Sequence, residues 1–158
     1  MKIKVCGMKY RDNIKILAAL QPDFIGFIFY PGSPRYMVDI LVPEDLDLIP
    51  EGIQKAGVFV NAEQKEVANR AKQYGLDLIQ LHGNESPGYC REMNRDGYQL
   101  IKAFNLNDNF NFGILEDFIP FCRYFLFDAF TSRFGGSGKK FNWELLKNYN
   151  CDHPFLLS

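Results

Sequence analysis

The sequence lacks the features that mark membrane, secreted and nucleic-acid-binding proteins. Its longest strongly apolar run is Phe24–Tyr30, far short of the roughly 20 residues that a membrane-spanning helix needs. No apolar segment of the secretory type follows the N-terminal lysines. The net charge is −1, and basic residues cluster only at Lys139-Lys140. We therefore expect a cytoplasmic protein with neither a membrane nor a nucleic acid as partner.

Cysteines are few and far apart. Cys6, Cys90, Cys122 and Cys151 match neither a zinc-binding spacing nor a Cys-x-x-Cys motif. In the absence of a secretory signal, reduced thiols are the expectation. No Gly-x-Gly-x-x-Gly motif follows the first apolar run either, which disfavours a dinucleotide-binding sheet.

What the sequence does contain is a regular alternation of strand and helix patterns. Its 158 residues suit one domain, and contents of 47% apolar and 23% charged residues are typical of a globular core. Short β-rich runs alternate with amphipathic segments. The expected strands are Lys2–Cys6, Asp23–Tyr30, Gln54–Val60, Leu76–Leu81, Tyr98–Phe104, Cys122–Asp128 and His153–Ser158. The expected helices are Asn13–Leu20, Glu44–Ile49, Ala62–Tyr74, Pro87–Asp96, Phe110–Ile119 and Trp143–Tyr149.

This alternation indicates a parallel sheet of the α/β class. The run Asp23–Tyr30 is apolar almost throughout, as in a strand buried on both faces. A doubly wound sheet and a (β/α)8 TIM barrel both fit the pattern. Residues capable of chemistry end several strands, which favours the barrel, where strand ends converge on one mouth. A doubly wound sheet gathers its site at one switch point instead. We expect one barrel domain over residues 1–158.

Capping residues predict where the helices begin and end. Asn61 is expected to cap the helix that follows it, and Gly75 to end that helix. Ser86 is expected to cap the next helix, with Pro87 in its first position. Asn142 is expected to cap the last helix.

Cys6 is the first candidate for chemistry, because it stands where the first strand ends. A thiol at the carboxyl end of a strand lies where α/β folds place their reactive groups. To act as a general base it must be a thiolate, which nearby positive charge or backbone N–H groups would favour. The alternative is a small buried apolar side chain with no further role.

Asp128 is the second candidate and ends an aromatic and aliphatic run. An unpaired carboxyl buried there would favour its protonated form. A carboxyl that keeps its proton near neutral pH can act as a general acid. The alternatives are a helix cap and a buried ion pair.

Three further side chains have both a functional and a structural interpretation. Arg35, in the loop after the second strand, could hold a carboxylate with two hydrogen bonds or lie in solvent. His82, after Gln80-Leu81, could contact a ligand or make a structural hydrogen bond. Lys102, inside a strand, could form a Schiff base or extend its amine to solvent.

The glycine-rich stretch Gly135–Gly138 could bind an anion through backbone amides, and a lid over the site is the alternative. It is not a P-loop, because Arg133 replaces the first glycine and Lys140 the Ser or Thr.

Several stretches together resemble one family, phosphoribosylanthranilate isomerase. They occur in order over nearly the whole chain and in register with the strand–helix pattern. They are Lys4-Val5-Cys6-Gly7, Gly26-Phe27-Ile28-Phe29 with Ser33-Pro34-Arg35, Gly57-Val58-Phe59-Val60-Asn61, Gln80-Leu81-His82-Gly83, Phe127-Asp128, and Gly135-Gly136-Ser137-Gly138 with Phe141-Asn142-Trp143.

The resemblance implies a (β/α)8 barrel enzyme of tryptophan biosynthesis that needs no cofactor. Its phosphorylated small-molecule substrate, N-(5-phosphoribosyl)anthranilate, becomes 1-(2-carboxyphenylamino)-1-deoxyribulose 5-phosphate by an Amadori rearrangement. By the same resemblance Cys6 is the general base, Asp128 is the general acid and Arg35 holds the anthranilate carboxylate. Substrate contacts are expected from Gln80, His82 and Gly136.

The resemblance also implies a departure at the C-terminus. The family continues past Ser158 with a phosphate-binding loop and an eighth strand. We therefore expect a barrel that lacks the end of unit seven and unit eight. Open strand edges would favour a homo-oligomer. Either the chain is a truncated product or another chain completes the edge.

Two other functions remain open at this point. One is a sugar-phosphate aldolase that forms a Schiff base on Lys102. The other is a barrel fragment that catalyses nothing, because it lacks the loop that would bind phosphate.

Overall fold

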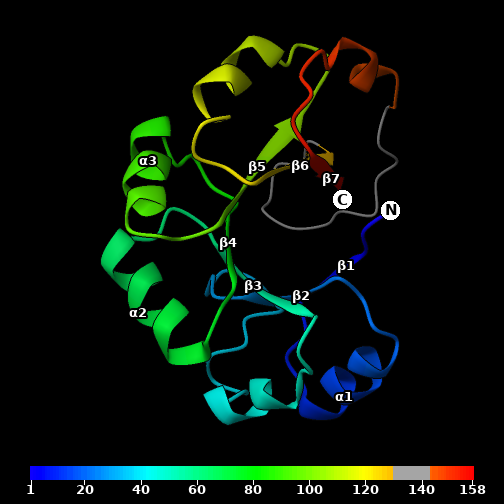
Figure 1. Ribbon diagram of the computed structural model, residues 1–158, viewed down its shortest axis with the longest axis vertical. Coiled ribbons are helices and arrows are strands. Elements are labelled where there is room, and N and C mark those ends of the chain that lie inside the picture. The colour runs from blue at the N-terminus through cyan, green and yellow to red at the C-terminus, as the bar shows by residue number, and fades with distance from the viewer. Residues whose placement is uncertain (130–142) are drawn as a thin grey trace. The chain divides into compact units, whose positions relative to one another are not determined.

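The computed structural model describes residues 1–129 and 143–158 (Figure 1). Each predicted strand is present in the described part, with ends shifted by a few residues. The strands are β1 (Lys4–Cys6), β2 (Phe24–Ile28), β3 (Gln54–Phe59), β4 (Leu78–Leu81), β5 (Leu100–Leu106), β6 (Tyr124–Ala129) and β7 (Phe155–Leu157). The α-helices are α1 (Arg11–Ala19), α2 (Gln64–Tyr74) and α3 (Pro87–Arg95). The 3₁₀ helices are η1 (Pro43–Leu48), η2 (Phe112–Asp117) and η3 (Trp143–Asn148).

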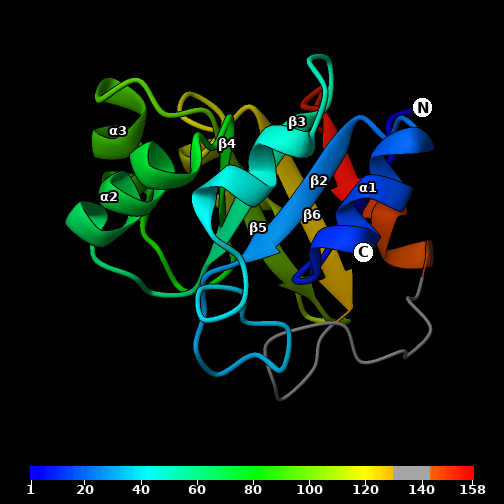
Figure 2. The same ribbon diagram turned by 90° about the horizontal axis from the view of Figure 1, so that it is seen from below.

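The chain forms two compact units, residues 1–80 and residues 81–158. In the first unit, β1, β2 and β3 pair in parallel and in chain order. Cys6 lies opposite Gly26, which in turn lies opposite Ala56. All five residues of β2 are buried, as its unbroken apolar run predicts. Figures 1 and 2 show α1, η1 and α2 on one side of these strands, where η1 contacts both α-helices.

In the second unit, β5, β6 and β7 also pair in parallel and in chain order. Asn105 lies opposite Asp128 in this register. The core of the unit is aromatic: the Phe104 ring meets those of Phe118 and Phe125 edge to face, with centroids 5.3 Å away in both cases. Such pairs stabilise beyond the area that they bury. Asp128 stands three residues after Phe125 on β6. Because side chains alternate along a strand, Asp128 lies on the opposite face of the sheet from this cluster.

The capping predictions are confirmed at α3 and at the end of α2. The Ser86 hydroxyl accepts a hydrogen bond from the Tyr89 amide at 3.2 Å, and Pro87 takes the first helical position. Gly75 ends α2 in the left-handed conformation, with φ at 56°. Both features follow the usual asymmetry of helix ends.

The prediction that Asn61 caps α2 is wrong. Asn61 has a φ of 51° and belongs to the left-handed turn after β3, a conformation that asparagine tolerates better than most residues. The helix begins only at Gln64, and Glu63 before it makes no side-chain capping hydrogen bond. The capping role expected of Asn142 lies outside the described residues.

The segment expected to form a helix over Phe110–Ile119 is a shorter 3₁₀ helix, η2. The Asn111 side chain accepts from the Gly113 amide at 2.9 Å, and such local bonding competes with an α-helix. Leu115 and Phe118 are buried, whereas Ile119 is 36% exposed. Within the described ranges, no helix combines the length and the apolar character needed to cross a bilayer.

We predict that Ser86→Ala lowers the free energy of unfolding by about 1 kcal/mol, because it removes the hydrogen bond that caps α3. Urea denaturation followed by far-UV circular dichroism measures this loss. Glu63→Ala is the matched control, since Glu63 holds the same position before α2 without a capping bond. Equal losses in the two variants would contradict the role given to Ser86.

Candidate functional site

The Cys6 side chain ends β1 and lies against the backbone of β2. A Cβ atom on Gly26, its partner in the register, would come 2.5 Å from the Cys6 Sγ. Real Cβ atoms do not approach other atoms so closely, so the thiol occupies space that only a glycine leaves open. The amides of Gly7 and Met8 both donate to the Gly26 carbonyl, at 2.9 and 3.2 Å. These bonds fasten the turn after Cys6 to the same point of β2.

Arg35 lies against the turn that follows Cys6. A Cβ atom on Gly7 would stand 2.6 Å from the Arg35 Cδ and 3.1 Å from its Nη1. Gly7 also has a φ of 92°, which only glycine adopts readily. The structure therefore brings a guanidinium next to the residue that follows the thiol.

Hydrogen bonds hold the loop that carries Arg35. The Arg35 amide donates to the Ser33 Oγ at 3.1 Å, and the Lys9 ammonium donates to the Pro34 carbonyl at 2.9 Å. The first bond lies within the loop after β2, and the second ties this loop to the segment after β1. Arg35 is only partly buried, so its guanidinium is held in place while staying accessible to a ligand. Such an arginine suits a carboxylate, which can accept two parallel hydrogen bonds from it.

In the second unit, Asp128 and His82 meet. Asp128 is only 6% exposed near the end of β6, and its Oδ2 lies 3.5 Å from the His82 Nε2. Both side chains are largely withdrawn from water. The expectation of an unpaired carboxyl at Asp128 is therefore wrong, because the loop after β4 places an imidazole beside it. The two groups can share a proton, and they form an ion pair when the imidazole is protonated.

Lys102 is buried, contrary to the expectation that its amine extends to solvent. The residue is 3% exposed, and its ammonium lies 3.2 Å from the Glu85 Oε2. It also donates to the carbonyls of Leu81, Gly83 and Ala103. A Schiff base forms on an amine that a carbonyl substrate can reach, whereas this amine is buried and bonded to Glu85 and three backbone carbonyls. The geometry therefore gives the aldolase alternative no support.

The remaining predicted site residues are Gln80 and Gly136. Gln80 is buried within β4, at 2% exposure. Gly136, together with the rest of the Gly135–Gly138 stretch, lies outside the described residues. In the part of the chain that the structure describes, no group of three or more His, Cys, Asp or Glu side chains could hold a metal ion.

The other cysteines differ from Cys6 in their surroundings. All four thiols are free, as expected, but Cys90 and Cys122 are buried in the core of the second unit. A hydrogen bond with Cys90, together with burial, raises the pKa of Cys122. A buried thiol of this kind is inert. Cys6 and Cys151 are both partly exposed, and of these two only Cys6 stands at the end of a strand.

Comparison with known proteins identifies the family. A family model described as N-(5'phosphoribosyl)anthranilate (PRA) isomerase matches residues 3–158. An N-(5'-phosphoribosyl)anthranilate isomerase from Phocaeicola vulgatus is 40% identical over 158 residues, which make up 100% of this chain and 75% of that protein. The chain belongs to the PRA isomerase family. The PRA isomerase of Parabacteroides distasonis is 43% identical over 162 residues, covering 100% of this chain and 72% of the relative.

Solved PRA isomerase structures share the fold. The Thermotoga maritima structure has a TM-score of 0.78 at 31% identity and covers 100% of this chain and 76% of its own. The Thermus thermophilus structure has a TM-score of 0.79 at 26% identity, over 93% of this chain and 70% of the other. These matches confirm the predicted (β/α)8 barrel class.

The sequence analysis did not single out Glu85, the buried partner of Lys102. Its side chain is 1% exposed, and both its oxygens accept from the Gly83 amide, at 3.2 and 3.0 Å. A signal was present, since Lys102 stands in an apolar strand and a buried lysine needs an anionic partner. The identity of that partner depends on the loop after β4, which no periodicity describes.

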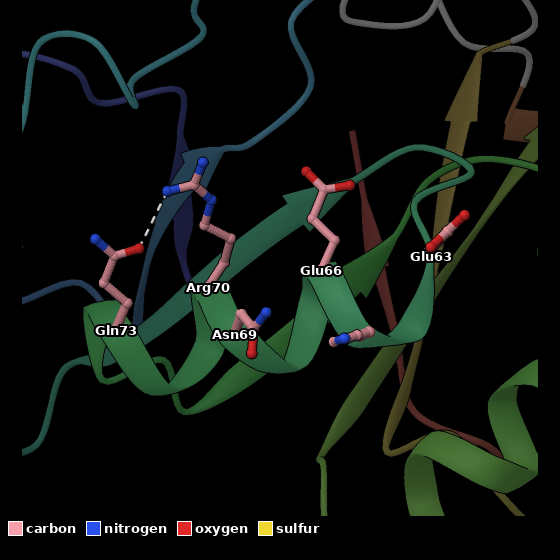
Figure 3. A pocket seen from close by; sticks show the side chains of 6 residues that line it. Glu63, Glu66, Asn69, Arg70 and Gln73 are labelled. Carbon is pink, nitrogen blue, oxygen red and sulfur yellow. Dashed lines mark hydrogen bonds between the residues drawn. The ribbon is translucent and has the colours of Figure 1, made fainter.

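The hollows in the described part of the chain include one that adjoins this site and one that does not. The first, of about 460 Å³, is lined by Gly83, Glu85, Lys102 and Asn105 among others. The second runs along α2 (Figure 3) and contains none of the predicted site residues. There the Arg70 Nη1 donates to the Gln73 Oε1 at 3.1 Å. The second hollow is thus the charged outer face of an amphipathic helix.

We predict that Gly7→Ala slows the alkylation of Cys6 by iodoacetamide, because the new methyl group displaces the Arg35 guanidinium. Peptide mass spectrometry separates Cys6 from the partly exposed Cys151. Gly52→Ala is the control, since Gly52 has a similar φ of 99° but nothing within 4 Å of an added Cβ. Both variants should lose about 1 kcal/mol of stability through backbone strain. Equal alkylation rates in the two variants would contradict the placement of Arg35.

Proposed function

We propose that the chain isomerises N-(5-phosphoribosyl)anthranilate to 1-(2-carboxyphenylamino)-1-deoxyribulose 5-phosphate in tryptophan biosynthesis. Membership of the PRA isomerase family supports this function. The observation that carries it is the Cys6 thiol at a strand end, with the Arg35 guanidinium against the next residue. This arrangement offers a base and a binding group for a carboxylate together.

In the proposed mechanism, Asp128 protonates the ring oxygen of the ribose. The bond between C1′ and that oxygen breaks, and the anthranilate nitrogen supplies its lone pair to form an iminium ion. His82, 3.5 Å from Oδ2, keeps the carboxyl in one orientation and can return a proton to it.

Cys6 then removes the proton from C2′, which the neighbouring iminium makes acidic. The electron pair of that bond moves to form an enolamine, which becomes the ketone as C1′ gains a proton and the C2′ hydroxyl loses one. The proton on the thiol is exchanged through solvent for the one lost by Asp128, so the cycle closes without a cofactor. General acid and general base steps of this kind each contribute about 10²–10⁴ in rate.

The remaining proposed contacts bind the substrate. Arg35 holds the anthranilate carboxylate by two hydrogen bonds, while Gln80, His82 and Gly136 contact other parts of the substrate. We further propose a cytoplasmic location. A homo-oligomer is also proposed, because Phe155 and Leu157 of β7 are 37% and 40% exposed. One solved structure, from Thermotoga maritima, is described as monomers generated from a dimeric PRA isomerase.

We predict that Cys6→Ala and Asp128→Asn each lower kcat by about 10²–10⁴, because each removes one proton-transfer group. The assay follows the loss of fluorescence of the anthranilate adduct, and urea denaturation shows whether the fold persists. Turnover close to wild type in either variant refutes its assigned role. If the well-folded wild-type chain shows no turnover at all, the alternative of a catalytically inactive barrel is correct.

Arg35→Lys is predicted to raise KM with little change in kcat, since lysine keeps the charge but cannot make two parallel hydrogen bonds to a carboxylate. Steady-state kinetics with N-(5-phosphoribosyl)anthranilate measures both constants. Arg91→Lys on the exposed side of α3 is the control and should change neither. An unchanged KM in Arg35→Lys would remove Arg35 from the binding site.

A further inference from the structure

Lys102 and Glu85 form a buried network around the residue that meets Asp128. The Lys102 Nζ lies 2.8 Å from the Gly83 carbonyl, 3.3 Å from the Leu81 carbonyl and 3.0 Å from the Ala103 carbonyl. Its counterion is Glu85, at 3.2 Å. Both Glu85 oxygens also accept from the Gly83 amide. Both side chains are almost entirely withdrawn from water, at 3% and 1% exposure.

These contacts fix the backbone of His82 on both sides. The Leu81 carbonyl, held by Lys102, belongs to the peptide group that precedes His82. The Gly83 amide, held by Glu85, belongs to the peptide group that follows it. Because peptide groups are planar, holding both planes determines the two backbone torsions of His82. The direction in which the imidazole leaves the backbone is then set by the ion pair.

Stability alone does not explain such a pair. Taking two charges out of water is costly, and apolar residues of similar size often serve a fold equally well. What apolar residues cannot do is hold a carbonyl and an amide on either side of one residue. An ammonium with three donors and a carboxylate with two acceptors supply the required bonds.

We propose that the Lys102–Glu85 pair positions His82 against Asp128, and that the pair thereby sets the rate of the proton transfer from Asp128. This inference rests on the proposed function for the role of Asp128. The two residues are positioning residues, because they act through His82. Misplacement of a catalytic group by about 1 Å can cost on the order of 10² in rate. A small change in the Lys102–Glu85 pair is therefore expected to lower the rate of the reaction.

Glu85→Gln tests the proposal with little change of shape. The amide oxygen can still accept from Gly83, but the side chain no longer carries the charge that holds Lys102. We expect kcat to fall by about tenfold to a hundredfold, with KM unchanged. In an Asp128→Asn background the same substitution should cause no further fall, because the group through which it acts is gone.

Asp45→Asn is the matched control. Asp45 is also a buried carboxylate, paired with Arg11 at 3.0 Å and accepting from the Val42 amide at 3.1 Å. It belongs to the first unit and holds no predicted site residue. The control should lose stability in urea as Glu85→Gln does, but it should keep its kcat.

The NMR signal of the His82 ring distinguishes a positioning role of the ion pair from a general contribution to stability. The sequence has two histidines, so NMR of protein labelled with ¹³C-histidine shows one ring signal for His82 and one for His153. His153 packs against Phe125 with ring centroids 4.3 Å apart, and burial lowers its pKa. We expect Glu85→Gln to shift the His82 signal and to leave that of His153 in place. Asp45→Asn should move neither.

The outcomes separate this inference from the proposed function. A His82 signal that stays in place in Glu85→Gln overturns the inference, even if the variant is less stable. A kcat equal to that of the wild type, in a chain that needs Asp128 for turnover, also overturns it. If Asp128→Asn is fully active, the proposed function fails, and a shifted His82 signal still supports the positioning of His82.

Discussion

Parallel pairing of neighbouring strands is the constraint on which the site depends. Because β1 pairs with β2 in one register, the Cys6 thiol meets Gly26, and the turn after it is hydrogen-bonded to the same glycine. In the second unit, the same kind of pairing sets Asp128 opposite Asn105. A slip by one residue would turn each of these side chains to the other face of its sheet. The chemistry therefore depends on buried apolar residues that never touch a substrate.

Each proposed proton-transfer group also depends on a second, local arrangement. Near Cys6 that arrangement is a guanidinium that can approach only because position 7 lacks a side chain. Near Asp128 it is the imidazole of His82, and the peptide groups on either side of His82 are hydrogen-bonded to a buried ion pair. The first brings positive charge toward a group that must lose a proton. The second places an imidazole beside a carboxyl that must give one up.

The sequence predicted the fold well because the strand and helix patterns are regular and the strands strongly apolar. It also predicted the residues at strand ends, since these follow from counting along each strand. It did not predict the left-handed turn at Asn61, because a good capping residue and a turn residue look alike in sequence. Nor did it predict the burial of Lys102 or the role of Glu85, which depend on how one loop folds back onto β5.

The most direct test of the central claim, acid–base transfer through an enolamine, is the fate of the hydrogen on C2′. The wild-type chain is allowed to turn over the substrate in D₂O, and the product is examined by mass spectrometry and NMR. Proton transfer through the thiol predicts a product with deuterium from the solvent at C1. A product formed in the same solvent that carries the original C2′ hydrogen at C1, with no deuterium, would contradict the exchange of the Cys6 proton with solvent on which the proposed cycle depends.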